Sequence, residues 1–396
     1  MKASTSRIHV IDAIRGFAVL GILIANIQSW SGYKFIPFDV VATLPYFHLD
    51  ALFLQLHEIL VDGKFYAIFS ILFGAGFGIQ YERNREKGPA FISKYRKRTG
   101  LLLIFGIVHT LCWSGDILGL YALLAFVLVM LRKIAVQHLL PVAVALLLFF
   151  LLPQVLASVF YEHPAGVAKV ALKTFPDATP LELTASFGTG GWADVLRMNL
   201  HNIYWRWHDF LPNGRISRVL GLFLLGFYLA RSGYFTSGIY SKSRLAVFLS
   251  IGILATATAV STDTNITQWA VSSQDVILKG VLVLGQICQA MAYMSMLAMI
   301  YASTRGESLL SPFTLIGRMA FTSYLLQTVI GMTLFYGVGF GYWGSMGLAQ
   351  LWLLALLIYT LQVLFCALWL KFYQKGPVEW LWASLTAGRM AANRRS

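Results

Sequence analysis

His109 and Asp116 stand seven residues apart in the apolar stretch GIVHTLCWSGDILGLYA (106–122), a pairing that suits proton transfer. A carboxylate near a histidine fixes the imidazole tautomer and raises its basicity, as in many general bases. The Ser–Gly turn between them would end one helix and begin another, and Asp116 also suits the N-cap of the second helix. The pair therefore predicts either a general base with its orienting carboxylate or a structural contact.

A second polar set lies in the first apolar run, IDAIRGFAVLGILIAN (11–26). A helix advances about 100° and 1.5 Å per residue, so Arg15 and Asn26 fall on nearly the same face, about 16 Å apart along the axis. Asp12 is near enough on the helix surface to pair with Arg15. The pattern predicts one wall of a polar path along the helix; the alternative is a structural ion pair and an asparagine that packs between helices.

Other apolar runs carry polar residues as well. Lys279, Gln286 and Tyr293 recur every seven residues and so share one helix face. Arg318 and Gln327 are nine apart, which places them on nearly opposite faces, so they cannot both line one straight groove. Besides Asp12 and Arg15, the candidates for ligand binding inside the runs are therefore Lys64, which could equally snorkel at a membrane edge, Lys279, Gln286, Arg318 and Gln327.

The composition defines the elements that must position these residues. Of 396 residues, 58% are apolar and only 12% are charged, about half the charged fraction of a soluble domain. Several runs reach the roughly 18–20 apolar residues that cross a bilayer as a helix. We expect an all-α polytopic membrane protein, one integral domain over 1–396, with about ten spans near 9–30, 64–82, 99–115, 116–132, 138–160, 216–233, 244–263, 276–302, 313–336 and 347–371.

The charges between these spans predict the topology. Alternate connections are basic, most densely the loop at about 82–98, whereas the connections between them are poor in Lys and Arg. The positive-inside rule then places both termini in the cytoplasm, in the inner membrane of a bacterium. The same distribution explains the formal net charge of +14 without a nucleic-acid partner.

Two long segments are expected on the external side. Residues 31–63 form an amphipathic segment that includes His48 and His57. Residues 161–215 interleave Trp, His, Arg and Asp, a composition typical of a lid or acceptor site or, alternatively, of an aromatic interfacial belt. The three cysteines lie in separate apolar runs without metal-binding spacing, so no metal is expected.

Five stretches carry a resemblance over essentially the whole chain: DAIRGFAVLGILIAN, GKFYAIFSILFGAGFG, GIVHTLCWSGDILGLYA, GRMAFTSYLLQ and GPVEWLW. In this order they resemble the domain-of-unknown-function 418 (YeiB-like) family of bacterial membrane proteins. The first stretch is also similar to the first helix of transmembrane acyltransferases, among them heparan-α-glucosaminide N-acetyltransferase. That similarity implies an acyl-CoA entrance near Asp12 and Arg15, a reaction centre near Asn26 and a histidine as base.

The resemblance leaves the base open. O-acyltransferases of the larger group have histidine where this chain has Asn26, and the glucosaminide enzyme has a catalytic histidine shortly after its asparagine, where this chain has Pro37. His109, His48 and His57 are the alternatives.

We expect a membrane acyltransferase that moves an acyl group, acetyl above all, from cytoplasmic acyl-CoA to a hydroxyl or amine of an external glycan or lipid. A transporter of a small polar solute is the alternative, and a scaffold protein is a third. The sequence leaves the oligomeric state open, with a homodimer among the options.

Overall fold

The computed structural model describes residues 9–160, 178–210, 213–264, 270 and 272–395. In these residues the chain is helical, apart from turns and one isolated bridge between Tyr373 and Arg394. The principal helices are α1 (His9–Trp30), α2 (Phe38–Val41), α3 (Asp50–Leu56), the π-turn η2 (His57–Val61), α4 (Lys64–Arg83), α5 (Gly88–Cys112), α6 (Leu118–Met130), α7 (Val136–Leu148), α8 (Leu151–Phe160), α10 (Pro180–Leu183), the π-turn η5 (Thr184–Thr189), α11 (Trp192–Phe210), α12 (Arg215–Arg231), α13 (Lys242–Ser261), α14 (Ser273–Tyr301), α15 (Gly306–Leu309), α16 (Ser311–Arg318), α17 (Ala320–Phe335), α18 (Leu348–Phe372) and α19 (Pro377–Ala387).

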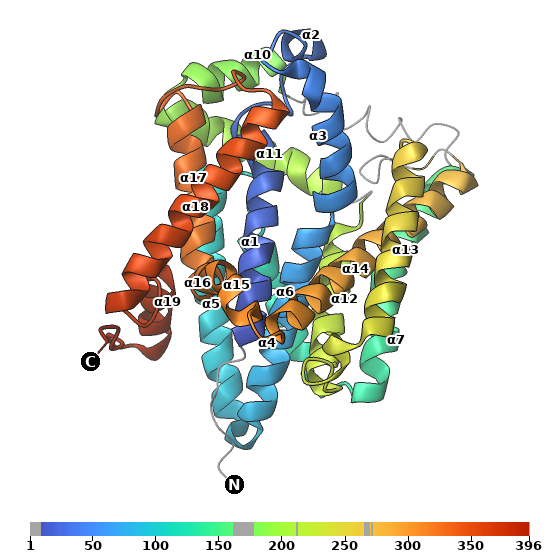
Figure 1. Cartoon of the computed structure of the whole chain (residues 1–396), viewed down its shortest axis with the longest axis vertical. Coiled ribbons are helices and arrows are strands. Elements are labelled where there is room, and N and C mark those ends of the chain that lie inside the picture. Colours follow the sequence, from blue (N-terminus) through green and yellow to red (C-terminus); the bar gives the residue numbers. More distant parts are fainter. Residues whose placement is uncertain (1–8, 161–177, 211–212, 265–269, 271, 396) are drawn as a thin grey trace.

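Six helical stretches in the described residues are long and apolar enough to cross a membrane. They are His9–Trp30, Phe47–Arg83, Val136–Leu156, Lys242–Ser261, Ser273–Tyr301 and Leu348–Phe372. The expected class, an all-α multi-pass membrane protein, is confirmed, whereas the count of ten spans and the side on which the termini lie stay predictions. The helices run roughly side by side as an upright bundle (Figure 1).

The span expected at 313–336 is two helices rather than one. α16 ends at Arg318 and α17 begins at Ala320. The break is held by Glu379 of α19, whose carboxylate accepts from the backbone N–H groups of Phe321 (2.8 Å) and Thr322 (3.1 Å), as an N-cap residue does within its own helix. The straight-helix argument that set Arg318 against Gln327 therefore does not apply.

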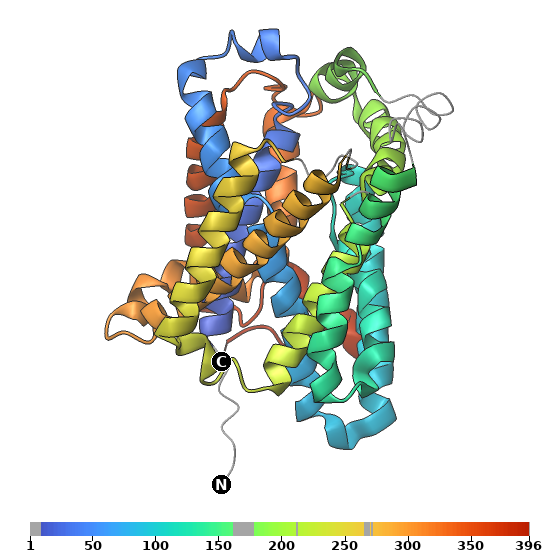
Figure 2. The same ribbon diagram turned by 90° about the vertical axis from the view of Figure 1, so that its right-hand side faces the viewer.

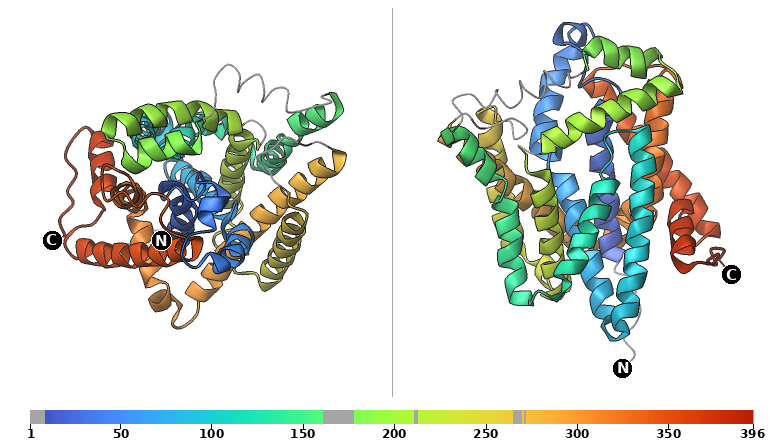
Figure 3. Two further views of the ribbon diagram at one scale, coloured as in Figure 1. Left: turned by 90° about the horizontal axis from the view of Figure 1, so that it is seen from above. Right: turned by 180° about the vertical axis from the view of Figure 1, so that it is seen from behind.

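Two other expected segments differ. The connection at 82–98 is not an open loop, because α4 continues to Arg83 and α5 already begins at Gly88. The run at 138–160 is divided between α7 and α8. Of the expected external loop, residues 161–177 lie outside the described residues, and the rest includes α11, which crosses obliquely near one end of the bundle (Figure 3).

α1 is the central element. It packs against α4, α14, α16, α17 and α18, and the view from above shows it enclosed by other helices (Figure 3). By contrast, α7 and α13 stand at one side of the bundle, at the right of Figure 1 and facing the viewer in Figure 2. Both are mostly exposed, as expected for helices that face lipid.

Two glycines allow α1 and α16 to approach closely. A Cβ on Gly16 would lie 1.9 Å from the carbonyl oxygen of Phe313, and one on Gly317 would lie 1.7 Å from that of Asp12. Only glycine fits at such a backbone contact, which is the usual way in which membrane helices pack closely. The hydroxyl of Tyr359 in α18 donates to the Gly16 carbonyl at 2.9 Å and fixes a third helix to the crossing.

Gly317→Ala should therefore force α1 and α16 apart and destabilise the protein by about 1–3 kcal/mol. Thermal unfolding of the detergent-purified protein measures this. Gly100→Ala is the matched control, because Gly100 has no neighbouring atom within 4 Å of the added Cβ and alanine favours the helix. Equal unfolding temperatures for the two variants would contradict the assignment.

Candidate functional site

A cavity of about 570 Å³ lies beside α1. Its wall follows α1 from Arg15 to Ser29, which is about 21 Å at the helical rise. The rest of the wall comes from η2, α4, α5, α6, α11, α12, α16, α17, α19 and the turn that holds Lys34. Six Lys or Arg side chains and two carboxylates line it: Arg15, Lys34, Arg98, Arg206, Arg215 and Arg318 against Asp62 and Glu379. The cavity therefore has an excess of positive charge.

Three arginines gather at the end of the cavity near the start of α1. Arg15 is held by Asp12 at 2.9 Å and reaches the carbonyl of Gly317 at 3.4 Å. Arg98 stacks on the Trp382 ring, 3.9 Å from its centroid, and is close enough to Arg15 for the two charges to repel. Arg318 is the residue after Gly317, at the close contact between α1 and α16. Arginines grouped in this way fit a phosphate-bearing ligand, because guanidinium groups bind phosphate oxygens bidentately.

The other end combines groups suited to proton transfer. Asn26 and Ser29 of α1 line it together with His57 and Asp62. His57 Nδ1 lies 3.0 Å from the side-chain amide of Gln28. Because His57 begins the π-turn η2 and Asp62 directly follows it, this short irregular segment holds both side chains against the cavity, and π-turns often occur at functional sites.

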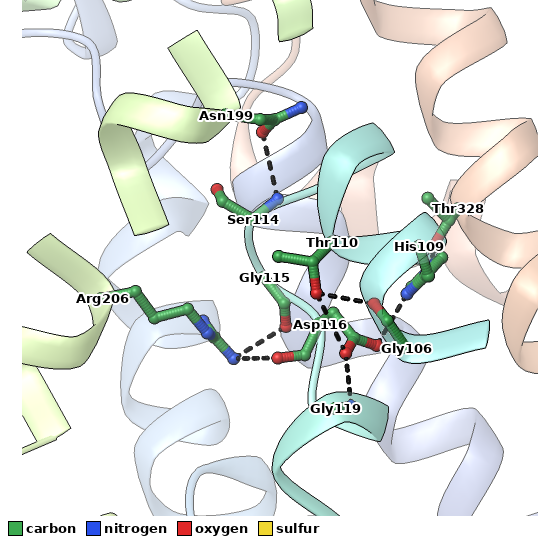
Figure 4. A network of polar contacts seen from close by, with 10 residues as sticks. All are labelled: Gly106, His109, Thr110, Ser114, Gly115, Asp116, Gly119, Asn199, Arg206 and Thr328. Carbon is green, nitrogen blue, oxygen red and sulfur yellow. Dashed lines mark hydrogen bonds and ion pairs between the residues drawn. The ribbon is translucent and has the colours of Figure 1, made fainter. Parts of the chain in front are cut away.

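Two cations stand beside this group. Arg215, the first residue of α12, has its guanidinium 4.3 Å from the centroid of the Tyr66 ring. Lys34 lies in the turn after α1, close enough to the Asp62 carboxylate for the two charges to interact. A further arginine of the cavity wall, Arg206 of α11, donates to the carbonyls of Gly115 and Asp116 at 2.8 and 2.9 Å (Figure 4).

His109 and Asp116 form a contact behind the wall of this cavity, which Gly115 and Ile117 line but neither of these two residues does. His109 Nδ1 lies 2.7 Å from the Asp116 carboxylate and Nε2 lies 2.8 Å from the Thr328 hydroxyl, so both ring nitrogens are engaged (Figure 4). The second Asp116 oxygen accepts from the backbone N–H of Gly119 at 2.8 Å, in the first turn of α6. The network joins α5, α6 and α17.

His109 and Thr328 face a second, smaller cavity of about 350 Å³. Its remaining wall is almost entirely apolar, with Cys112, Leu325 and Met332 among its members. An apolar cavity cannot hold a charged donor. His109 therefore faces a different cavity from the one that the arginines line.

His109→Ala should destabilise the protein by about 1–3 kcal/mol, because it leaves the buried Asp116 and Thr328 groups without their shared partner. Thermal unfolding in detergent, followed by tryptophan fluorescence, checks this. His138→Ala, at an exposed histidine, is the control. A His109→Ala protein as stable as this control would show that the network contributes no stability.

Several predicted ligand residues line neither cavity. Lys64 is fully buried and its ammonium donates to the Glu58 carbonyl, so the snorkelling alternative is wrong. Lys279 is also buried, and His48 is exposed.

Two predicted glutamines connect helices instead. Gln286 of α14 accepts from Arg218 of α12 at 2.8 Å. Gln327 of α17 donates to Gln362 of α18 at 3.0 Å. Both contacts are buried, where satisfied hydrogen bonds between helices stabilise the packing.

Six charged residues of the cavity wall were not named as candidates from the sequence: Lys34, Asp62, Arg98, Arg206, Arg215 and Glu379. The DGK sequence at 62–64, just before and at the start of α4, could have indicated Asp62. A carboxylate between two apolar segments costs free energy in a membrane unless it has a partner or a functional role. Arg98 belongs to the basic connection at 82–98, and Lys34 and Arg215 belong to the two segments expected on the external side. Nothing in their neighbours along the chain indicates that they face one cavity.

Among the described residues, no group of three or more His, Cys, Asp or Glu is placed to hold a metal ion. The bundle and its cavity define a multi-pass membrane protein with a cation-rich internal site.

Comparison with known proteins identifies its family. A family model described as "Protein of unknown function (DUF418)" matches residues 229–389. The uncharacterized protein YxaH of Bacillus subtilis (strain 168) is 30% identical over 401 residues, which cover 97% of this chain and 95% of the relative. The uncharacterized protein YeiB of Escherichia coli (strain K12) is 28% identical over 95% of each chain. No solved structure matches significantly. The chain belongs to the DUF418 family.

Proposed function

We propose that this protein is a membrane acyltransferase that moves an acyl group, acetyl above all, from cytoplasmic acyl-CoA to a hydroxyl or amine acceptor on the external side of a bacterial inner membrane. The observation that carries the proposal is a single cavity lined at one end by Arg15, Arg98 and Arg318 and at the other by Asn26 and His57. A donor with phosphates at one end and a thioester at the other matches this division.

The orientation follows from the charge pattern of the sequence. With ten spans and both termini in the cytoplasm, the arginine end opens to the cytoplasm and the Asn26 end lies toward the outside. The CoA phosphates then bind the arginines, and the extended pantetheine arm runs beside α1. This scheme brings the thioester to Asn26 without moving the nucleotide across the membrane.

In this scheme His57 is the general base, since it is the histidine among the three alternatives that lines the cavity. The Gln28 amide nitrogen faces Nδ1 in the structure; turning this amide by 180° directs its carbonyl oxygen to an Nδ1–H group and leaves the lone pair on Nε2. Nε2 removes the proton of the acceptor as the acceptor oxygen or nitrogen bonds to the thioester carbon. The Asn26 amide donates to the developing oxyanion. The C–S bond then breaks, and the departing thiolate receives the proton from His57.

His57→Gln should lower acetyl transfer by about 10²–10⁴-fold, the usual contribution of a general base. The measurement is transfer of radiolabelled acetyl from acetyl-CoA to lipids and glycans in membrane vesicles that contain the protein. His48→Gln is the matched control, because it changes an exposed histidine of the same segment outside the cavity. Equal transfer by both variants, or wild-type transfer no higher than in vesicles without the protein, would refute the proposal.

Arg98→Gln should weaken binding of CoA by about tenfold, the effect of losing one charge-assisted hydrogen bond. Calorimetry on the purified protein in a neutral detergent measures the affinity. Arg85→Gln removes a charge from a side chain that is 73% exposed between α4 and α5 and should bind CoA normally. If both variants bind as the wild type does, the arginine end is not the donor site.

A transporter of a small polar solute is the second candidate, because the polar lining follows α1 from Arg15 to Ser29 and such a path also suits permeation. Uptake of a solute into proteoliposomes without acyl-CoA would favour it. Strict dependence of all labelling on acyl-CoA would favour the transferase.

A further inference from the structure

The outer end of the main cavity holds more positive charge than acyl transfer requires. Lys34 and Arg215 line it, yet the described residues provide neither side chain with a hydrogen bond or a close ion pair. The Nε–H group of Arg215 is buried without an acceptor. In the proposed transfer reaction the thioester end of the donor is uncharged, so it does not account for these cations.

The nearby acidic group does not neutralise them. Asp62 interacts electrostatically with both Lys34 and Arg215, but neither contact is an ion pair within the described part of the chain. Arg218, one turn further along α12, adds another positive charge; its terminal N–H groups donate to neutral groups, the Gln286 side chain and the Asn213 carbonyl, and its Nε–H is buried without an acceptor. Asp62 thus stands among four cations, Lys34, Lys64, Arg215 and Arg218, and Glu58 is the second carboxylate of this group.

The backbone adds to this excess. Arg215 is the first residue of α12, and the N-terminus of a helix carries a partial positive charge and free N–H groups. Gly214 before it has a φ of +56°, and a Cβ there would lie 2.0 Å from the Phe150 side chain, so the turn that places Arg215 requires glycine. An arginine in this position is unfavourable unless an anion compensates it.

The guanidinium is also oriented. Stacking on Tyr66 occupies the flat face of Arg215 and leaves its N–H edge for hydrogen bonds. An edge of this kind binds a phosphate or carboxylate group in a bidentate manner. A free ammonium such as that of Lys34 can contribute a further charge-assisted bond from another direction.

We propose that the outer end of the cavity is an anion-binding subsite in which Arg215 and Lys34 hold a phosphate or carboxylate of the acceptor. The acceptor is then an acidic molecule, either a phosphate-bearing lipid or a soluble acidic sugar, with its reactive hydroxyl or amine directed to His57. This inference rests on the proposed transfer reaction only in naming the bound molecule an acceptor; the subsite itself is tested by binding alone.

The test measures binding to the full-length protein in a neutral detergent, with CoA present to occupy the arginine end. Glucosamine 6-phosphate and short-chain phosphatidic acid are the probes for the two sources, and glucosamine and short-chain diacylglycerol are their uncharged counterparts. The wild type should bind one of the charged probes at least about tenfold more tightly than its counterpart, as expected for one charge-assisted contact. The charged probe that binds identifies the source.

The variants separate the two ends of the cavity. Arg215→Gln and Lys34→Gln should each weaken the charged probe about tenfold and leave CoA binding unchanged, whereas Arg98→Gln should do the reverse. Lys371→Gln, at an exposed lysine outside the cavity, controls for the loss of a charge, and unfolding temperatures show that each variant is folded.

The inference is overturned if charged and uncharged probes bind equally, or if Arg215→Gln and Lys34→Gln both bind the charged probe as the wild type does. These outcomes are distinct from failure of the proposed function. Loss of selectivity for the anion with CoA binding and acetyl transfer intact refutes the subsite alone, while anion binding without acetyl transfer refutes the transferase alone.

Discussion

The backbone contact between α1 and α16 is the constraint on which the site depends. Gly16 and Gly317 each stand against a carbonyl of the opposite helix, so neither position can carry a side chain. The residues next to them in the sequence, Arg15 and Arg318, both line the main cavity. Two arginines from segments some 300 residues apart in the chain are therefore placed together by backbone packing, before any interaction between their side chains is considered.

Burying a charged side chain in a membrane protein costs free energy, and this cost shapes how the chain places its charges. Charged groups in the bundle are tolerated only with partners or in a polar cavity, and this chain uses both solutions. Asp12 pairs with Arg15, Glu379 caps α17, and Asp116 joins His109 to the start of α6. Lys34, Asp62 and Arg215 instead face the cavity without an ion pair among the described residues, and Arg15 and Glu379 line the same cavity although they also hold structural contacts.

The family relationship agrees with a site built from the whole chain. The DUF418 match begins at residue 229 and includes α16, α17 and α19, which supply Arg318 and Glu379. α1, η2, α4 and α5, which supply the opposite wall, precede it, but the full-length relatives cover these helices as well. A fragment limited to the matched region would lack Asn26, His57 and most of the arginines.

Composition and hydrophobic runs determined the class of the protein, because a helix that crosses a membrane must be apolar along most of its length. The same local rule located the end of α1 at residue 30, where the helix ends at Trp30, and placed Arg15 and Asn26 on one face. It could not locate the break at Met319, because the carboxylate that caps α17 comes from Glu379, about sixty residues later.

The tertiary structure alone decided which polar residues share a cavity. His109 and Asp116 do meet, as their spacing indicated, but Thr328 from a distant helix occupies the remaining ring nitrogen. Gln286 and Gln327 are buried polar groups that bond to other helices, whereas Lys34, Asp62, Arg98 and Arg215 line the cavity. Helical periodicity gives the direction of a side chain around its own axis, but what that side chain meets depends on how the helices pack, and here packing is set by contacts between segments far apart in the sequence.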